Sequence, residues 1–152
     1  MNFFSRMLIS LWIIALLSVA IEKPADAGDY IGDYCWNFAI TVDGDPVSGT
    51  IQMAINHICG GHFLCSGIIS VTSPISFQFT TFGNALFVEN QFRITLSAQS
   101  RKYDSLGNYT VGVSMYTIFL DPNTLNGVLE GIATYYDGNE VHEGIVTYTG
   151  CQ

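Results

Sequence analysis

The sequence predicts an all-β protein, an antiparallel up-and-down β-barrel of about eight strands. Apolar and polar side chains alternate with a period of two along most of the chain after residue 28, as in strands with one buried face. Turn-forming residues recur roughly every 8–15 positions, which is typical of serial hairpins. A closed barrel has no exposed strand edges, whereas the alternative architecture, a two-sheet β-sandwich, retains some. The alternation and the turn spacing together favour the barrel.

Clear turn signals separate the first three expected strands. A strand over residues 36–42 has an apolar side chain at every second position, and Asp43-Gly44-Asp45-Pro46 ends it. The next expected strand spans residues 50–58. The Gly60-Gly61 pair then turns the chain into a third strand over residues 62–71. These segments predict a meander from the beginning of the domain.

The rest of the chain continues the same pattern. Residues 75–82 are the fourth expected strand and 85–88 a short fifth, with a turn at Gly83-Asn84 between them. Ser100–Asn108 is the longest polar connection, where we expect a mobile loop. The Asp-Gly pair at 137–138 favours a tight hairpin. The remaining expected strands span residues 91–99, 109–120, 128–136 and 140–149.

Residues 1–27 have the pattern of a secretory signal peptide. Arg6 precedes an apolar run from Met7 to Ala20, and Ala25-Asp26-Ala27 provides the small residues that a signal peptidase recognises. The run is shorter than the roughly 20 apolar residues of a membrane-spanning helix, so we expect cleavage after Ala27 rather than an uncleaved anchor. Residues 28–152 then form a single secreted or periplasmic domain that does not insert into a membrane.

The charge of the chain argues against nucleic acid as a partner. Lys and Arg number 5 and Asp and Glu 13, which gives a net charge of −8. After residue 27 the basic side chains are those of Arg93, Arg101 and Lys102. These are too few for the basic stripe that phosphate binding needs.

The cysteines predict two disulfide bonds. All of them follow the expected cleavage site, and an even number in an exported domain indicates disulfides. In a closed meander the first strand pairs with the last, so Cys35 lies beside Cys151 and we predict a bond between them. Cys59 and Cys65 lie on either side of the Gly60-Gly61 turn, and we predict that they form the second bond.

Two groups of residues resemble reactive sites. Glu130 and Glu143 fall on one face of the hairpin around residues 137–138, and paired carboxylates can hydrolyse glycosidic bonds. The opposite face carries small and aromatic residues that suit a barrel interior, so we expect both glutamates to point outward. Residues 57–65 contain histidines and cysteines, but their spacing is not that of a zinc finger, and we predict no metal site. We also predict no cofactor.

The aromatic residues carry the leading functional hypothesis. We expect Trp36, Phe38 and Tyr148 to line the barrel mouth, where they bind a small apolar molecule. The protein is then a non-catalytic binding protein. Two alternatives remain open: a protein-binding or inhibitory module that acts through surface loops such as Ser100–Asn108, and a glycan-directed hydrolase that uses Glu130 and Glu143.

The layout of the chain resembles the calycin group, which comprises the lipocalins and the avidins. The shared features are an exported acidic chain, a tryptophan early in the first strand (Trp36), serial hairpins and a last strand that ends at a cysteine, Cys151. The Gly-x-Trp pattern of lipocalins is not met, because residue 34 is a tyrosine and the preceding glycine is Gly32. The resemblance implies the barrel and a ligand cavity, and it assigns no functional residue.

Overall fold

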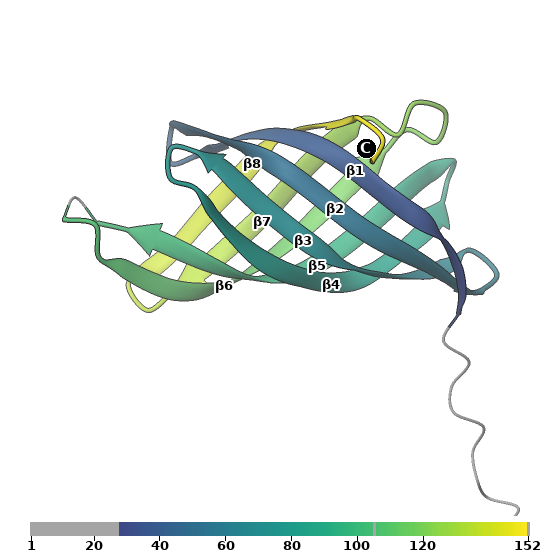
Figure 1. Cartoon of the computed structure of the whole chain (residues 1–152), viewed down its shortest axis with the longest axis horizontal. Helices are drawn as coiled ribbons and strands as arrows, with labels where there is room; N and C mark the ends of the chain where they lie inside the picture. Colours follow the sequence, from purple (N-terminus) through teal and green to yellow (C-terminus); the bar gives the residue numbers. More distant parts are fainter. Residues whose placement is uncertain (1–27, 105, 152) are drawn as a thin grey trace, which may run out of the picture.

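Eight antiparallel strands form one closed barrel, in which each strand pairs with its neighbours in the sequence (Figure 1). The computed structural model describes residues 28–104 and 106–151, so the predicted signal peptide, 1–27, lies outside the described residues. The strands are β1 (Asp29–Val42), β2 (Asp45–Cys59), β3 (His62–Ser73), β4 (Phe77–Val88), β5 (Gln91–Tyr103), β6 (Tyr109–Leu120), β7 (Gly127–Tyr135) and β8 (Gly138–Tyr148). Among these residues there is no helix with the length and apolar character that a membrane crossing requires.

Pairing of β1 with β8 closes the barrel. The register runs from Trp36 opposite Tyr148 to Val42 opposite His142. The predicted all-antiparallel barrel is therefore confirmed, and the β-sandwich alternative is wrong. The end of the barrel that carries the turns at 43–44 and 136–137 is called the pocket end below, and the opposite end, near Cys35 and Cys151, the terminal end.

The turn at the start of the meander follows directly from its sequence. Val42 pairs with Asp45, which leaves Asp43 and Gly44 as a two-residue hairpin loop. Both have positive φ values, 50° and 93°. Such a type I′ turn matches the right-handed twist of the strands, and Asp-Gly is one of its preferred sequences.

The predicted turn at Gly83-Asn84 is wrong. These residues lie inside β4, where Gly83 pairs with Cys65 on one side and Leu96 on the other. A Cβ atom at residue 83 would lie 1.9 Å from the carbonyl oxygen of Thr95, so only glycine allows the backbones to approach this closely. Here the glycine marks a tight strand contact and not a change of direction.

The predicted mobile loop at Ser100–Asn108 is shorter than expected. β5 continues to Tyr103 and β6 begins at Tyr109. Ser100 is buried inside the barrel despite its polar side chain. Polar composition predicted a loop over the whole stretch, but residues 100–103 continue β5 and only residues 104–108 connect the two strands.

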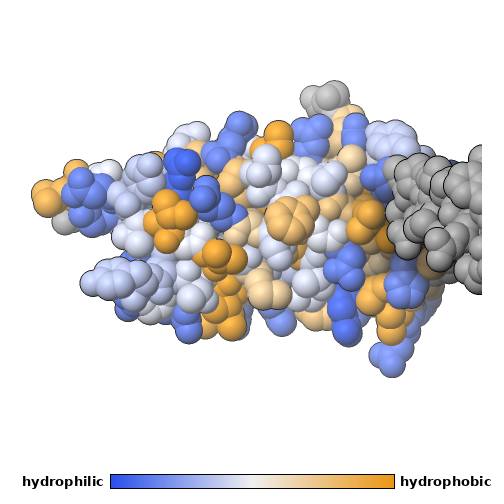
Figure 2. Space-filling model, turned by 90° about the horizontal axis from the view of Figure 1, so that it is seen from below, coloured by the Kyte–Doolittle hydropathy of each residue, from blue (hydrophilic) through white to orange (hydrophobic). Residues whose placement is uncertain are grey.

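Alternate residues of every strand point into the barrel and form its core. The inward positions include Trp36, Met53, Leu96 and Ile118, all of which are almost fully buried. The outer wall is mixed, with exposed apolar residues such as Phe82 among polar ones. On the face shown in Figure 2, hydrophobic side chains occur in separate groups between hydrophilic ones. The alternation that predicted the strands therefore also separates the inside of the barrel from the outside.

The disulfide between Cys35 and Cys151 is present and joins β1 to the segment after β8 at the terminal end. Next to it, the backbone N–H of Thr149 donates a hydrogen bond to the carbonyl oxygen of Cys35, with an N···O distance of 2.9 Å. This predicted bond is confirmed.

The predicted bond between Cys59 and Cys65 is wrong, because both are free thiols. An irregularity in the β2–β3 ladder lets Cys59 pair with His62, while Cys65 pairs with Ile55. Cys59 is exposed, whereas Cys65 points into the barrel and is buried. The symmetric spacing about the turn predicted facing thiols, but the two side chains lie on different sides of the barrel wall.

The cysteine arrangement predicts a specific thiol count. At pH 8 we expect a thiol reagent such as Ellman's reagent to modify Cys59 in the native protein, and Cys65 only after unfolding. Burial raises the pKa of the Cys65 thiol to about 11, which suppresses the reactive thiolate. The intact mass should lie about 2 Da below that of the reduced chain, because one disulfide removes two hydrogens. If both thiols react only after unfolding, or if both react in the native protein, this assignment is contradicted.

Candidate functional site: a cavity at the pocket end

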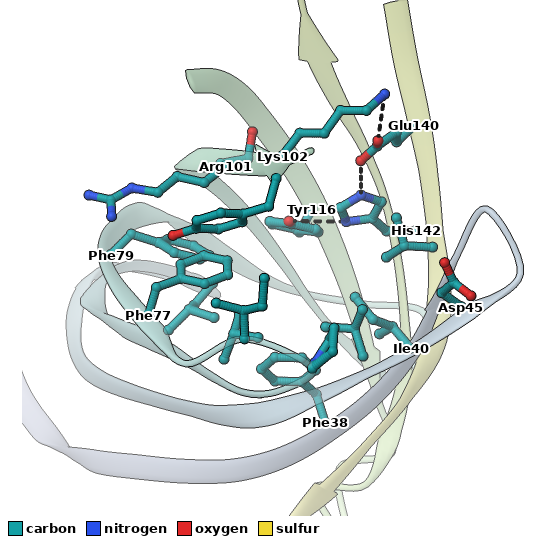
Figure 3. Close-up of a pocket in the computed structure, with 18 of the residues that line it drawn as sticks. Phe38, Ile40, Asp45, Phe77, Phe79, Arg101, Lys102, Tyr116, Glu140 and His142 are labelled. Carbon is teal, nitrogen blue, oxygen red and sulfur yellow. Dashed lines mark hydrogen bonds and ion pairs between the residues drawn. The ribbon is translucent and has the colours of Figure 1, made fainter. Parts of the chain in front are cut away.

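A cavity of about 370 Å³ opens at the pocket end of the barrel (Figure 3). This volume lies in the lower part of the range for small-molecule sites, about 300–1,000 Å³. Its lining is apolar on one side and polar on the other, and the two sides come from different strands. The described residues thus form a concave site with both hydrophobic surface and a few polar groups.

The apolar side is built by β1 to β4. Phe38 and Ile40 of β1 and Ile69 of β3 line this side, and Phe77 and Phe79 of β4 complete the wall. The two phenylalanine rings stack with their centroids 5.8 Å apart. Because these residues occupy alternate strand positions, they all point inward.

The polar side is built by β5, β6 and β8, and we call Ser100, Lys102, Tyr116, Glu140 and His142 the polar wall. Lys102 Nζ lies 3.0 Å from Glu140 Oε1, and Tyr116 Oη lies 3.2 Å from His142 Nδ1. Figure 3 shows the four side chains of these two contacts side by side at the back of the cavity. The polar wall thus contains two linked pairs, Lys102 with Glu140 and Tyr116 with His142, together with Ser100.

Two atoms of the polar wall have unused hydrogen-bonding capacity. His142 Nε2 is 3.7 Å from Glu140 Oε2, which is too long for a hydrogen bond. This nitrogen and the Ser100 hydroxyl are buried, and neither has a hydrogen-bond partner among the described residues. Buried polar groups without partners are rare in native proteins and require an explanation.

The protonation of the polar wall follows from its burial. Burial lowers the pKa of His142 against the opposing effect of Glu140, and burial raises the pKa of Tyr116 to about 12. Both groups are therefore uncharged at neutral pH. The hydrogen bond and the charge of Glu140 raise the pKa of Lys102, so its ammonium stays charged. The wall thus has one ion pair, whose lysine is partly exposed, and two neutral hydrogen-bonding rings.

The residues predicted to line the mouth are separated in the structure. Phe38 is part of the cavity, but the prediction that Trp36 and Tyr148 lie beside it in one mouth is wrong. Trp36 packs deeper, toward the terminal end, where its indole N–H donates to the carbonyl oxygen of Leu125 at 2.8 Å. Tyr148 packs against Trp36 with ring centroids 5.9 Å apart. Trp36 therefore fills the barrel interior between the cavity and the terminal end.

Glu130 and Glu143 lie directly opposite each other on β7 and β8. Both are exposed and point away from the barrel interior, as the small and aromatic residues of the opposite face predicted. The hydrolase alternative needs these carboxylates to enclose a substrate in a cavity. Their position on the outer wall does not provide one.

The polar wall was missed by the sequence analysis, although a signal for it was present. The face of the β7–β8 hairpin opposite Glu130 and Glu143 was predicted to point inward, and Gly144 and Val146 lie on that face. The same alternation places His142 and Glu140 inside the barrel as well. Polar and charged side chains are seldom buried, so the alternation alone does not identify these two as interior residues.

Comparison with known proteins does not assign a family. No protein-family model, curated protein or solved structure matches this chain significantly. Within residues 28–104 and 106–151, no three or more His, Cys, Asp or Glu side chains cluster so that they could hold a metal ion. The functional argument therefore rests on the cavity.

Proposed function

We propose that this protein is a secreted or periplasmic, non-catalytic barrel that binds a small, mainly apolar molecule in the cavity at the pocket end. The observation that carries the proposal is the cavity itself, which has an apolar wall and a small number of converging polar groups. This is the usual composition of a small-molecule site. The architecture is compatible with a calycin-like barrel, and the Cys35–Cys151 bond is consistent with an oxidising compartment.

The chemistry of the polar wall supports binding more than catalysis. Tyr116, with its pKa raised to about 12, is a poor proton donor at neutral pH. Lys102 is held by Glu140 and is not a free nucleophile. The groups can orient a ligand by hydrogen bonding, but they do not include an activated nucleophile beside a base.

A fluorescence titration with N-phenyl-1-naphthylamine tests the proposal. We expect saturable binding to the wild-type protein, with blue-shifted emission because the dye enters an apolar environment. Val71 lines the cavity, so Val71→Phe should fill part of it and weaken binding by about tenfold or more, equivalent to about 1.4 kcal/mol. The matched control is Val113→Phe, the same substitution at an exposed position of the outer wall. It should leave the affinity unchanged.

Two results would overturn the proposal. One is the absence of saturable dye binding to the folded protein. The other is equal weakening by Val71→Phe and Val113→Phe, which would place the dye on the outer wall. Ile69→Phe, at a second cavity position, guards against a folding defect specific to residue 71. Either result would favour the alternative of a protein-binding module.

A further inference from the structure

The polar wall indicates which chemical class of ligand the cavity selects. Ser100 and His142 are both more than nine-tenths buried, at 4% and 6% exposure, and both belong to the cavity lining. We infer that the ligand carries one uncharged hydrogen-bonding group, such as a hydroxyl, on an apolar body, and that this group binds in the polar wall. This inference rests on the proposed function.

The unused hydrogen-bonding capacity of the wall is the first argument. The Ser100 hydroxyl can donate one bond and accept two, and the imidazole of His142 has Nε2 left over after its contact with Tyr116. A buried polar atom without a partner destabilises the protein, since it has lost its bonds to water. A ligand hydroxyl can both donate and accept. It therefore suits a wall that offers a serine and a neutral histidine.

The charge balance of the site is the second argument. Glu140, the most deeply placed carboxylate, is already neutralised by Lys102 at 3.0 Å. A ligand carboxylate here would lie beside Glu140 and near Asp137, which is 3.6 Å from the same ammonium. A ligand ammonium would lie beside Lys102. A carboxylate would lose its hydration without gaining a free counter-ion, and an ammonium in the wall would lose its hydration while the free carboxylates, Asp43 and Asp45, stay exposed at the rim.

The charges at the rim do not reverse this balance. Asp43, Asp45 and Arg101 also line the cavity, near its opening. The guanidinium of Arg101 lies 5.0 Å from the centre of the Tyr109 ring in a cation–π contact, and Figure 3 shows it pointing away from Glu140 and His142. The acidic side chains at the rim further disfavour an anionic ligand. An uncharged group remains the best match for the interior.

A matched ligand series tests the inference. Naphthalene, 1-naphthol, 1-naphthoic acid and 1-naphthylmethylamine share one ring system and at pH 7.5 carry no polar group, a hydroxyl, a negative charge and a positive charge. Each is used to displace N-phenyl-1-naphthylamine from the wild-type protein. We expect 1-naphthol to bind about threefold to tenfold more tightly than naphthalene, the effect of one net hydrogen bond. Both charged compounds should bind more weakly than 1-naphthol.

Two variants locate the effect in the polar wall. His142→Phe and Ser100→Ala should each reduce the advantage of 1-naphthol over naphthalene, measured as the ratio of the two affinities within the same variant. The matched control is His62→Phe, at an exposed position near the terminal end. It should retain the full advantage. Ser100→Ala removes only a hydroxyl, so it still tests the inference where His142→Phe fails to fold.

The outcomes separate this inference from the proposed function. If the dye and naphthalene bind in the cavity but 1-naphthol has no advantage, or a charged compound binds most tightly, the inference is wrong and the proposed function stands. An advantage that persists in both His142→Phe and Ser100→Ala also refutes the inference. If neither the dye nor any compound binds the folded protein, the proposed function fails and the inference fails with it.

Discussion

Replacing Cys35 and Cys151 by alanine is expected to lower the free energy of unfolding by about 5 kcal/mol. The disulfide closes a loop with a sequence separation of 116 residues. In the chain-entropy model, a loop of this length restricts the unfolded chain by about 4.7–5 kcal/mol. This is a large fraction of the 5–15 kcal/mol that typically stabilises a domain. Urea unfolding, followed by the fluorescence of Trp36, measures the loss.

The matched control is Cys59→Ala, which removes an exposed free thiol and should change the stability by less than about 0.5 kcal/mol. β8 pairs with β1 where the barrel closes, and this pairing places His142 opposite Val42. A loss below about 2 kcal/mol would mean that the unfolded chain gains little freedom and that the β1–β8 ladder holds the termini without the bond.

The overall fold could be predicted from sequence because its signals are local and repeated. Alternation of side chains in each strand, together with turn residues such as Asp43-Gly44, determined where the chain reverses. Closure of the barrel followed from the need to remove strand edges. The Cys35–Cys151 bond followed in turn, since closure places the first strand beside the last.

Two of the errors share one physical cause, which is that the sequence shows spacing but not how neighbouring strands approach and align. Gly83 resembles a turn residue, yet it lies where β4 and β5 approach closely. Cys59 and Cys65 have a symmetric spacing about a turn, yet an irregularity in the ladder places them on different sides of the wall. Such details depend on the tertiary register, which local patterns do not specify.

The candidate site was predictable only in part. Phe38 was assigned to the mouth because it is an aromatic residue in a clear strand. The polar wall depends on contacts between residues far apart in the chain, such as Lys102 with Glu140 and Tyr116 with His142. Each is an unremarkable polar residue when it is read alone. Their combined role becomes visible only when the barrel brings β5, β6 and β8 together.

Trp36→Ala is expected to lower the free energy of unfolding by about 3–5 kcal/mol, the usual cost of truncating a buried large aromatic residue. The indole is 2% exposed and packs between Tyr34 and Tyr148. The substitution also removes the hydrogen bond to the carbonyl oxygen of Leu125. Urea unfolding followed by circular dichroism measures the change, because the variant lacks the only tryptophan after residue 27.

The same variant decides whether Trp36 has a purely structural role or contacts the ligand. Trp36 does not belong to the cavity lining, whereas Phe38 does. At a temperature where the variant is folded, the affinity for N-phenyl-1-naphthylamine should therefore stay within about threefold of wild type, a difference of about 0.7 kcal/mol or less. Phe38→Ala, two positions along the same strand, should weaken dye binding. A tenfold loss of affinity in Trp36→Ala with Phe38→Ala unaffected would place the ligand at the terminal end, beside Tyr148.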